Sequence, residues 1–131
     1  MSNFRKKLGN FGEELAAEEI QRQGMEILAR NWRCPLGEID IIARKDGLVA
    51  VIEVKTRRGR SAGTPEQAVD DQKQRKLCKL AQCYIESIGW EGEVRIDVVG
   101  VELSTSGELL RVTYWPDAVE CWDEWTSDTW F

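Results

Sequence analysis

The segment of residues 38–57 constrains the fold of this chain more than any other part of the sequence. Two runs rich in Ile and Val flank the dipeptide Asp46-Gly47. An Asp-Gly pair between two such runs is among the strongest short-range signals for a β-hairpin. With a two-residue loop, residues equally distant from the turn face each other, so the sequence predicts that Asp40 lies opposite Glu53.

Four charged residues share one face of this predicted hairpin. Side chains alternate along a strand, so Glu38 and the facing Lys55 point the same way as Asp40 and Glu53. The other face carries an unbroken apolar layer, formed by Ile39, Ile41 and Ala43 on one strand and Ala50, Ile52 and Val54 on the other. The turn and the alternation therefore predict the same register.

Two directly opposed carboxylates repel each other, so the pair Asp40 and Glu53 requires a compensating positive charge. A hard divalent cation such as Mg²⁺ or Mn²⁺ is suited to carboxylate, carbonyl and water oxygens. Lys55 adds an ammonium group that could orient or deprotonate a water molecule, or contact a phosphate oxygen. The simpler alternative is the solvated face of a sheet, with Glu38 and Lys55 as a cross-strand ion pair.

The remaining periodicity predicts two helices and three more strands. An apolar stripe of Phe4, Leu8, Phe11, Leu15 and Ile20 predicts a first helix that ends before Gly24. A second helix is expected from Thr64-Pro65 to about Ile88, with Asp70-Asp71 as an alternative start. Strands are expected at residues 25–33, 93–103 and 109–115, followed by a short helix from Asp117. We therefore expect an α/β fold with a mixed five-stranded sheet: the first three strands are antiparallel, a parallel crossover leads to the fourth, and helices flank the sheet.

The composition limits the chemistry. The chain has 131 residues, enough for one domain, and contains no histidine, which excludes Ser-His-Asp and Cys-His hydrolases, His-ligated zinc sites and nucleases with a His base. None of its four cysteines forms a C-x-x-C pair, and all are expected to be reduced packing residues. Without a membrane-length apolar run or a secretory signal, a cytoplasmic protein with no membrane contact is expected.

Charge is unevenly distributed. Residues 55–79 contain eight Lys or Arg residues and three acidic ones, although the net charge of the chain is −5. This local basic segment predicts nucleic-acid contacts. Residues 116–131 are acidic and rich in Trp, and we expect a domain at 1–115 followed by this tail. Trp32 and Trp115 are expected to pack in or near the core; the tail could dock a protein partner or cover the basic segment.

Several motifs in the same order resemble the YraN-type family. They are GNFGEELA (9–16), ILARNWR (27–33), GEIDII (37–42), EVKTR (53–57), the Gly-x-Pro-x-x-Ala-Val run (63–69) followed by Lys73, and RIDVV (95–99). That family is regarded as a predicted endonuclease of the PD-(D/E)xK superfamily, similar in fold to archaeal Holliday-junction resolvases. The resemblance therefore implies a restriction-endonuclease-like core.

The resemblance also implies roles for individual residues. Asp40 and Glu53 would hold the metal, Lys55 would be the motif lysine, and Glu13 would be the extra acidic residue of resolvase-like members. Glu38, Gln67 and Lys73 would lie at the edge of the site. Ile39 stands where the superfamily has its proline, and Asp97 belongs to a family motif with no chemistry that we can assign.

These arguments predict a metal-dependent nuclease that acts on DNA with structural selectivity or none, because no base-reading element is evident. Its phosphate contacts would come from Arg57, Arg58, Arg60, Lys73 and Lys76. Resolvase-like relatives act as dimers, which makes a homodimer one expectation. The alternatives are a noncatalytic nucleic-acid-binding module and a protein-interaction domain that uses the tail.

Overall fold

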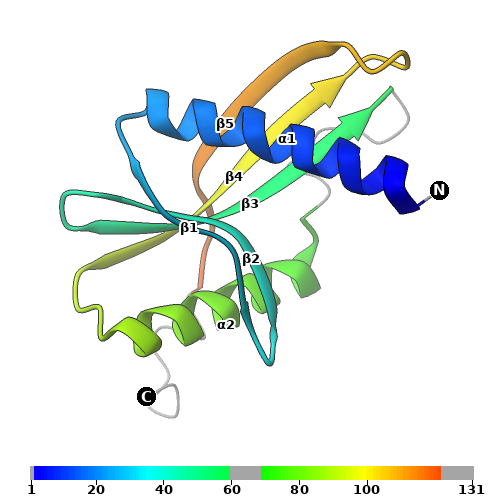
Figure 1. Ribbon diagram of the computed structural model, residues 1–131. Coiled ribbons are helices and arrows are strands. Elements are labelled where there is room, and N and C mark those ends of the chain that lie inside the picture. Colours follow the sequence, from blue (N-terminus) through cyan, green and yellow to red (C-terminus); the bar gives the residue numbers. More distant parts are fainter. Residues whose placement is uncertain (1, 60–68, 122–131) are drawn as a thin grey trace.

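The computed structural model describes the backbone of residues 2–59 and 69–121, and the side chains from residue 10 onward within these ranges. The elements in chain order are α1 (Ser2–Arg22), β1 (Glu26–Cys34), β2 (Gly37–Lys45), β3 (Leu48–Arg58), α2 (Asp71–Ile88), β4 (Glu93–Leu103) and β5 (Leu109–Val119). Within the described residues, the strands form one five-stranded sheet in the order β1-β2-β3-β4-β5 (Figure 1). The predicted α/β class is confirmed.

The central hairpin has the predicted register. β2 and β3 pair antiparallel from Lys45–Leu48 to Ile41–Ile52, so the loop is the Asp46-Gly47 dipeptide. Asp46 turns the chain with a φ of 53°. Beyond Ile41–Ile52 the two strands no longer form a regular ladder, and this is the point at which the charged residues begin.

β3 and β4 are parallel along their whole length, and α2 makes the crossover between them, as predicted. α2 begins at the alternative start, because the Asp70 side chain accepts a hydrogen bond from the Lys73 N–H at 2.8 Å and caps the helix. The earlier predicted start at Thr64 lies outside the described residues. The helix ends at Gly89 in the left-handed conformation.

The helices cover opposite faces of the sheet, α1 on one and α2 on the other (Figure 1). The core under α1 contains Ile41, Ala43, Ala50 and Ile52 of the hairpin together with β4 residues. The core under α2 contains Ile42, Val49 and Val51 together with α2 residues, and Trp32 and Trp115 pack against it as expected. Each strand of the hairpin thus buries both of its faces.

Three local predictions are wrong. Ile39 belongs to the core under α2 instead of the α1 face, because the regular β2–β3 ladder, on which the alternation was counted, ends at Ile41–Ile52. Phe11 of the predicted stripe is 45% exposed; α1 buries Ile20 of that stripe together with Ala16 and Ala17. No helix starts at Asp117, because β5 continues to Val119.

The prediction of four reduced cysteines is wrong for two of them. Cys78 of α2 and Cys121, which follows β5, form a disulfide with a Cα–Cα distance of 5.8 Å. Cys34 and Cys83 are free thiols, as predicted. The packing of α2 against the end of β5 brings together residues 43 positions apart in sequence. In the described part of the chain, neither helix is sufficiently long and apolar to cross a membrane.

Candidate active site

The acidic residues of the hairpin lie where the ladder between β2 and β3 ends. The Val54 N–H donates a hydrogen bond of 2.8 Å to Asp40 Oδ2, so a side chain of β2 occupies the place of a backbone acceptor. This bond fixes the Asp40 carboxylate against β3. Glu53, the residue before Val54, is 5% exposed and lies close enough to raise the pKa of Asp40.

The environment of Asp40 disfavours a negative charge. Burial raises the pKa of this carboxyl from 3.8 to about 7, and repulsion from Glu53 acts in the same direction. The Val54 N–H and Lys73 lower the pKa of Asp40, whereas Glu13 raises it. A cation bound beside Asp40 would stabilise its ionised form.

Two lysines from different elements contact the Glu53 carboxylate. Lys55 Nζ, from the same strand, lies 3.5 Å from Glu53 Oε1, and Lys73 Nζ, from α2, lies 3.3 Å from the same oxygen. The Asp70 cap at the start of α2 holds the Lys73 backbone, so the helix terminus brings this second ammonium group to the sheet. Lys55 and Glu53, two of the predicted site residues, are thus in direct contact.

Glu13 approaches the site from α1, and Asn31 links it to Glu38. With its amide oriented to satisfy both carboxylates, Asn31 donates to Glu38 Oε1 at 2.8 Å and to Glu13 Oε1 at 3.2 Å. Burial raises the pKa of Glu13, and Arg30 opposes this effect. Glu38 forms an ion pair of 3.5 Å with Arg33, whereas the ion pair of Lys55 is with Glu53. The cross-strand pair of Glu38 with Lys55 is therefore not the arrangement in the described residues.

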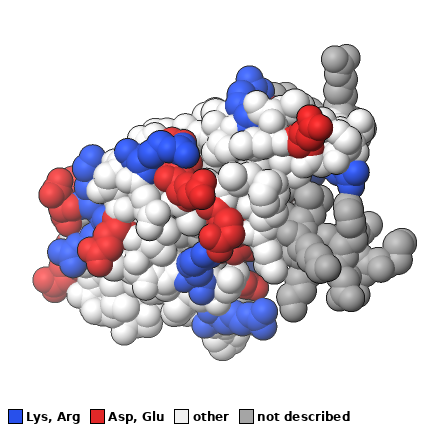
Figure 2. Space-filling view, turned by 45° about the horizontal axis from the view of Figure 1, so that its top comes forward, with Lys and Arg blue, Asp and Glu red and all other residues white. Residues whose placement is uncertain are grey.

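The predicted phosphate contacts are placed differently from one another. Arg57 is half-buried, and its Nε has no hydrogen-bond partner among the described residues. Arg58 Nε donates to the Thr105 carbonyl at 2.8 Å, toward the turn between β4 and β5. Lys76 is exposed on α2. Arg60 and Gln67 lie outside the described residues. On the face drawn in Figure 2, acidic and basic side chains are intermingled.

Two features of the site were missed or underrated in the sequence. Lys73 was expected at the edge of the site and as a phosphate contact, yet it contacts Glu53 directly. Asn31 was not singled out at all, although it lies within the ILARNWR motif and joins Glu13 to Glu38. Its positive φ could not be read from the sequence, because the preceding and following residues predict an ordinary strand.

The residues fit a divalent cation through two carboxylates. Within the described ranges, no three Asp, Glu, Cys or His side chains gather closely enough to form a complete metal cage. Mg²⁺ typically uses one or two carboxylates and completes its shell with water and substrate phosphates. Asp40, whose burial makes a nearby positive charge favourable, and Glu53 are the residues that would hold such an ion.

The chain is similar to proteins of one family along most of its length. The model of the uncharacterised protein family UPF0102 matches residues 12–101, a range that includes Glu13, Asp40, Glu53, Lys55 and Lys73. A UPF0102 protein of Roseiflexus castenholzii is 38% identical over 92% of this chain and 98% of its own length. A UPF0102 protein of Syntrophotalea carbinolica is 41% identical over 95% of this chain and all of its own length. A UPF0102 protein of Nocardia farcinica is 50% identical over 76% of this chain and 79% of its own.

Proposed function

Because the chain belongs to the uncharacterised protein family UPF0102, whose description names no activity, we propose its function from the site: a metal-dependent nuclease that hydrolyses phosphodiester bonds in nucleic acid. The observation that carries the proposal is the half-buried Asp40 carboxylate next to the buried Glu53, with Lys55 and Lys73 on the same Glu53 oxygen. Phosphodiester hydrolysis needs charge neutralisation and an activated water, and it does not require histidine.

Asp40 and Glu53 hold Mg²⁺ or Mn²⁺, which when bound supplies positive charge at the phosphate and acidifies water. Val54 fixes the Asp40 carboxylate through its N–H, so this ligand is oriented before any ion binds. Lys55 positions the attacking water or a phosphate oxygen. Lys73 holds Glu53 from α2, and Glu13 supports the site from α1.

The substrate is nucleic acid held by its phosphates, and DNA is the favoured form. Arg57 lies near the end of β3, the strand that carries Glu53, and its Nε lacks a partner in the described part of the chain. An arginine in this state can bind phosphate oxygens through its remaining N–H groups. Lys76 extends the contact along α2. Phosphate contacts carry no sequence information, so recognition is structure-selective or nonspecific.

A noncatalytic nucleic-acid-binding module is the second candidate, and one observation favours it. Glu53 already has two ammonium groups at 3.3 and 3.5 Å, so its negative charge is balanced without a metal. In this alternative the lysines and Arg57 bind phosphates and no bond is cleaved.

The two candidates are separated by one cleavage experiment. Labelled branched, duplex and single-stranded DNA, and RNA, are incubated with the protein in Mg²⁺, in Mn²⁺ or in chelator. A nuclease cleaves at least one substrate only with the metal. Asp40→Asn and Glu53→Gln then lower the rate by at least about 100-fold while electrophoretic mobility shifts show retained binding. Glu102→Gln, at a half-buried β4 residue that pairs with Arg111, serves as the matched control.

Metal-dependent cleavage that persists in both carboxylate variants would contradict the assignment of the site. Salt-sensitive binding with no cleavage under any metal would instead establish the binding module. Circular dichroism of each variant excludes loss of the fold as the reason for lost cleavage.

A further inference from the structure

A pocket of about 280 Å³ lies away from the candidate active site. Its walls include Met25, which follows α1, Lys45 and Leu48 beside the hairpin turn, and Arg95 of β4. Met25 and Leu48 belong to the core on the α1 side of the sheet, whereas Glu53 reaches Lys73 of α2 on the other side. Lys45 and Leu48 pair next to the hairpin turn, so the pocket lies at the turn end of β2 and β3, whereas Asp40 lies beyond the other end of their ladder.

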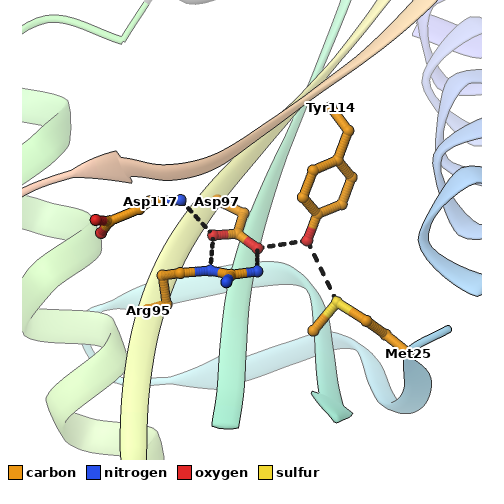
Figure 3. A network of polar contacts seen from close by, with 5 residues as sticks. All are labelled: Met25, Arg95, Asp97, Tyr114 and Asp117. Carbon is orange, nitrogen blue, oxygen red and sulfur yellow. Dashed lines mark hydrogen bonds and ion pairs between the residues drawn. The ribbon is translucent and has the colours of Figure 1, made fainter. Parts of the chain in front are cut away.

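Arg95 is held rigidly at this pocket by a buried carboxylate. Its Nε and Nη2 donate to the two oxygens of Asp97 at 2.8 and 2.9 Å (Figure 3). Asp97 has no exposed surface, and it also accepts hydrogen bonds from the Tyr114 hydroxyl and, at 2.8 Å, from the Asp117 N–H. Two of the five N–H groups of Arg95 are used by Asp97, which leaves donors for a further acceptor.

An irregularity of β5 completes the wall. The β4–β5 register shifts between Ile96 and Val98, and Asp117 adopts a φ of 54°. The Asp117 N–H leaves the ladder and bonds to Asp97, which places Pro116 at the pocket beside Tyr114. Bulges of this kind are common next to functional sites, where they redirect side chains.

The charge and size of the pocket define what it would take. Lys45 uses one of its three N–H donors on the Gln23 carbonyl at 3.2 Å. With Lys45 and Arg95 positive and Asp97 negative, these three groups carry a net charge of +1. Met25, Leu48 and Pro116 supply apolar surface. A volume near the lower end of the roughly 300–1,000 Å³ typical of ligand pockets suits a small molecule.

We propose that this pocket binds a small organic oxyanion. Its carboxylate or phosphate group contacts Arg95 and Lys45, and its apolar body lies against Met25, Leu48 and Pro116. The arginine fork fits either oxyanion, and its rigid hold on Asp97 reduces the entropy lost on binding. This site is independent of the proposed nuclease activity, because it shares no residue with the candidate active site.

The test is a titration of the full-length ¹⁵N-labelled protein with three probes of similar body: phenyl phosphate, benzoate and neutral benzamide. Both anions are expected to shift the backbone resonances of residues 23–25, 45–48 and 95 in a saturable manner, and benzamide is not. The tighter anion identifies the oxyanion that the pocket prefers. Lys45→Gln is expected to weaken binding about tenfold, the factor for one lost charge-assisted hydrogen bond.

Lys79→Gln, an exposed lysine on α2, is the control and is expected to leave the affinity unchanged. Shifts that never saturate, equal binding of benzamide, or equal loss in both lysine variants would overturn the proposal. Lys45 is exposed, so its variant is expected to keep the fold, which the unperturbed remainder of the spectrum verifies.

Discussion

Asp40 combines two properties that suit a metal ligand in a nuclease. Its carboxylate has a fixed position, and its ionisation carries a free-energy penalty that a bound cation would remove. The Val54 N–H holds one carboxylate oxygen at 2.8 Å, while burial and Glu53 raise the pKa of the group to about 7. A surface aspartate would have neither property. The same residue therefore provides a test of the electrostatics that does not depend on activity.

In the presence of chelator, Asp40 should contribute to the free energy of unfolding by an amount that decreases as the pH rises. The folded state keeps the proton up to a pH of about 7, whereas an unperturbed carboxyl releases it near 3.8. The contribution is therefore complete below about pH 4 and is lost toward pH 7, at up to about 1.4 kcal/mol per pH unit. Asp40→Asn removes it, so the difference in unfolding free energy between wild type and variant should fall across this range.

Urea unfolding at several pH values measures this difference, with Asp71→Asn at the exposed start of α2 as the control amide substitution. A difference that stays constant from about pH 4 to about pH 8 would mean that Asp40 titrates normally. Addition of Mn²⁺ should flatten the trend, because a cation favours the ionised carboxylate.

Asp97 has a structural role that its motif did not reveal. Its carboxylate is fully buried and receives hydrogen bonds from Arg95, Tyr114 and Asp117, which together hold the irregular part of β5 onto β4 (Figure 3). Asp97→Ala should lower the free energy of unfolding by roughly 3–5 kcal/mol, because it leaves partly buried partners unpaired. Glu102→Ala breaks the exposed pair with Arg111 and should cost less than roughly 1 kcal/mol. Similar losses in the two variants, measured by urea unfolding, would contradict the role assigned to Asp97.

The helices and strands differ in how far the sequence could predict them. The β2–β3 hairpin was predictable with its register, because the Asp46-Gly47 turn and the alternation of adjacent residues are both local signals. The crossover through α2 followed from the order of the elements. Ile39 could not be placed, since the local signals do not reveal that the regular β2–β3 ladder ends at Ile41–Ile52.

The residues of the candidate site also differ in how far the sequence could predict their positions. Asp40 and Glu53 were brought together by the hairpin alone, and their neighbourhood could be predicted from counting along two strands. The contact of Lys73 with Glu53 depends on where α2 packs, and the link from Glu13 to Glu38 depends on a conformation of Asn31 that strand patterns do not encode. The contacts that the sequence did not predict, those of Lys73 and Asn31, come from elements outside the hairpin.

The contact between α1 and β3 is set by a missing side chain. A Cβ added to Gly12 would overlap the Thr56 hydroxyl, so only glycine allows the helix to lie this close to the strand. Gly12→Ala should therefore lower the free energy of unfolding by about 1–3 kcal/mol, and Thr56→Ala should restore most of the loss when combined with it. Gly47→Ala, where nothing lies within 4 Å, is the matched control. Additive losses in the double variant, measured by urea unfolding, would show that the two residues do not conflict.

The candidate active site and the proposed pocket lie at different places on the sheet. α2 lies on one face of the sheet and α1 on the other (Figure 1). Lys73 of α2 contacts Glu53, while residues that follow α1 and residues of β5 line the proposed oxyanion pocket. The disulfide joins α2 to Cys121, two residues after the buried end of β5, so it connects the helix that carries Lys73 to the strand of the pocket. The sequence could not reveal this link, because neither cysteine has a local partner.

Loss of this disulfide should destabilise the whole chain rather than one end of it. The bond closes a segment of 43 residues, which by chain entropy contributes up to about 4 kcal/mol to the free energy of unfolding. Cys78→Ser/Cys121→Ser should show a loss of this size in urea, and reductant should have no further effect on it. Cys34→Ser/Cys83→Ser, which removes the two free thiols, should keep the full response to reductant. If reductant left the wild-type midpoint unchanged, the two sulfurs would not be bonded in solution, and α2 would be held to β5 by the buried contacts around Val119 alone.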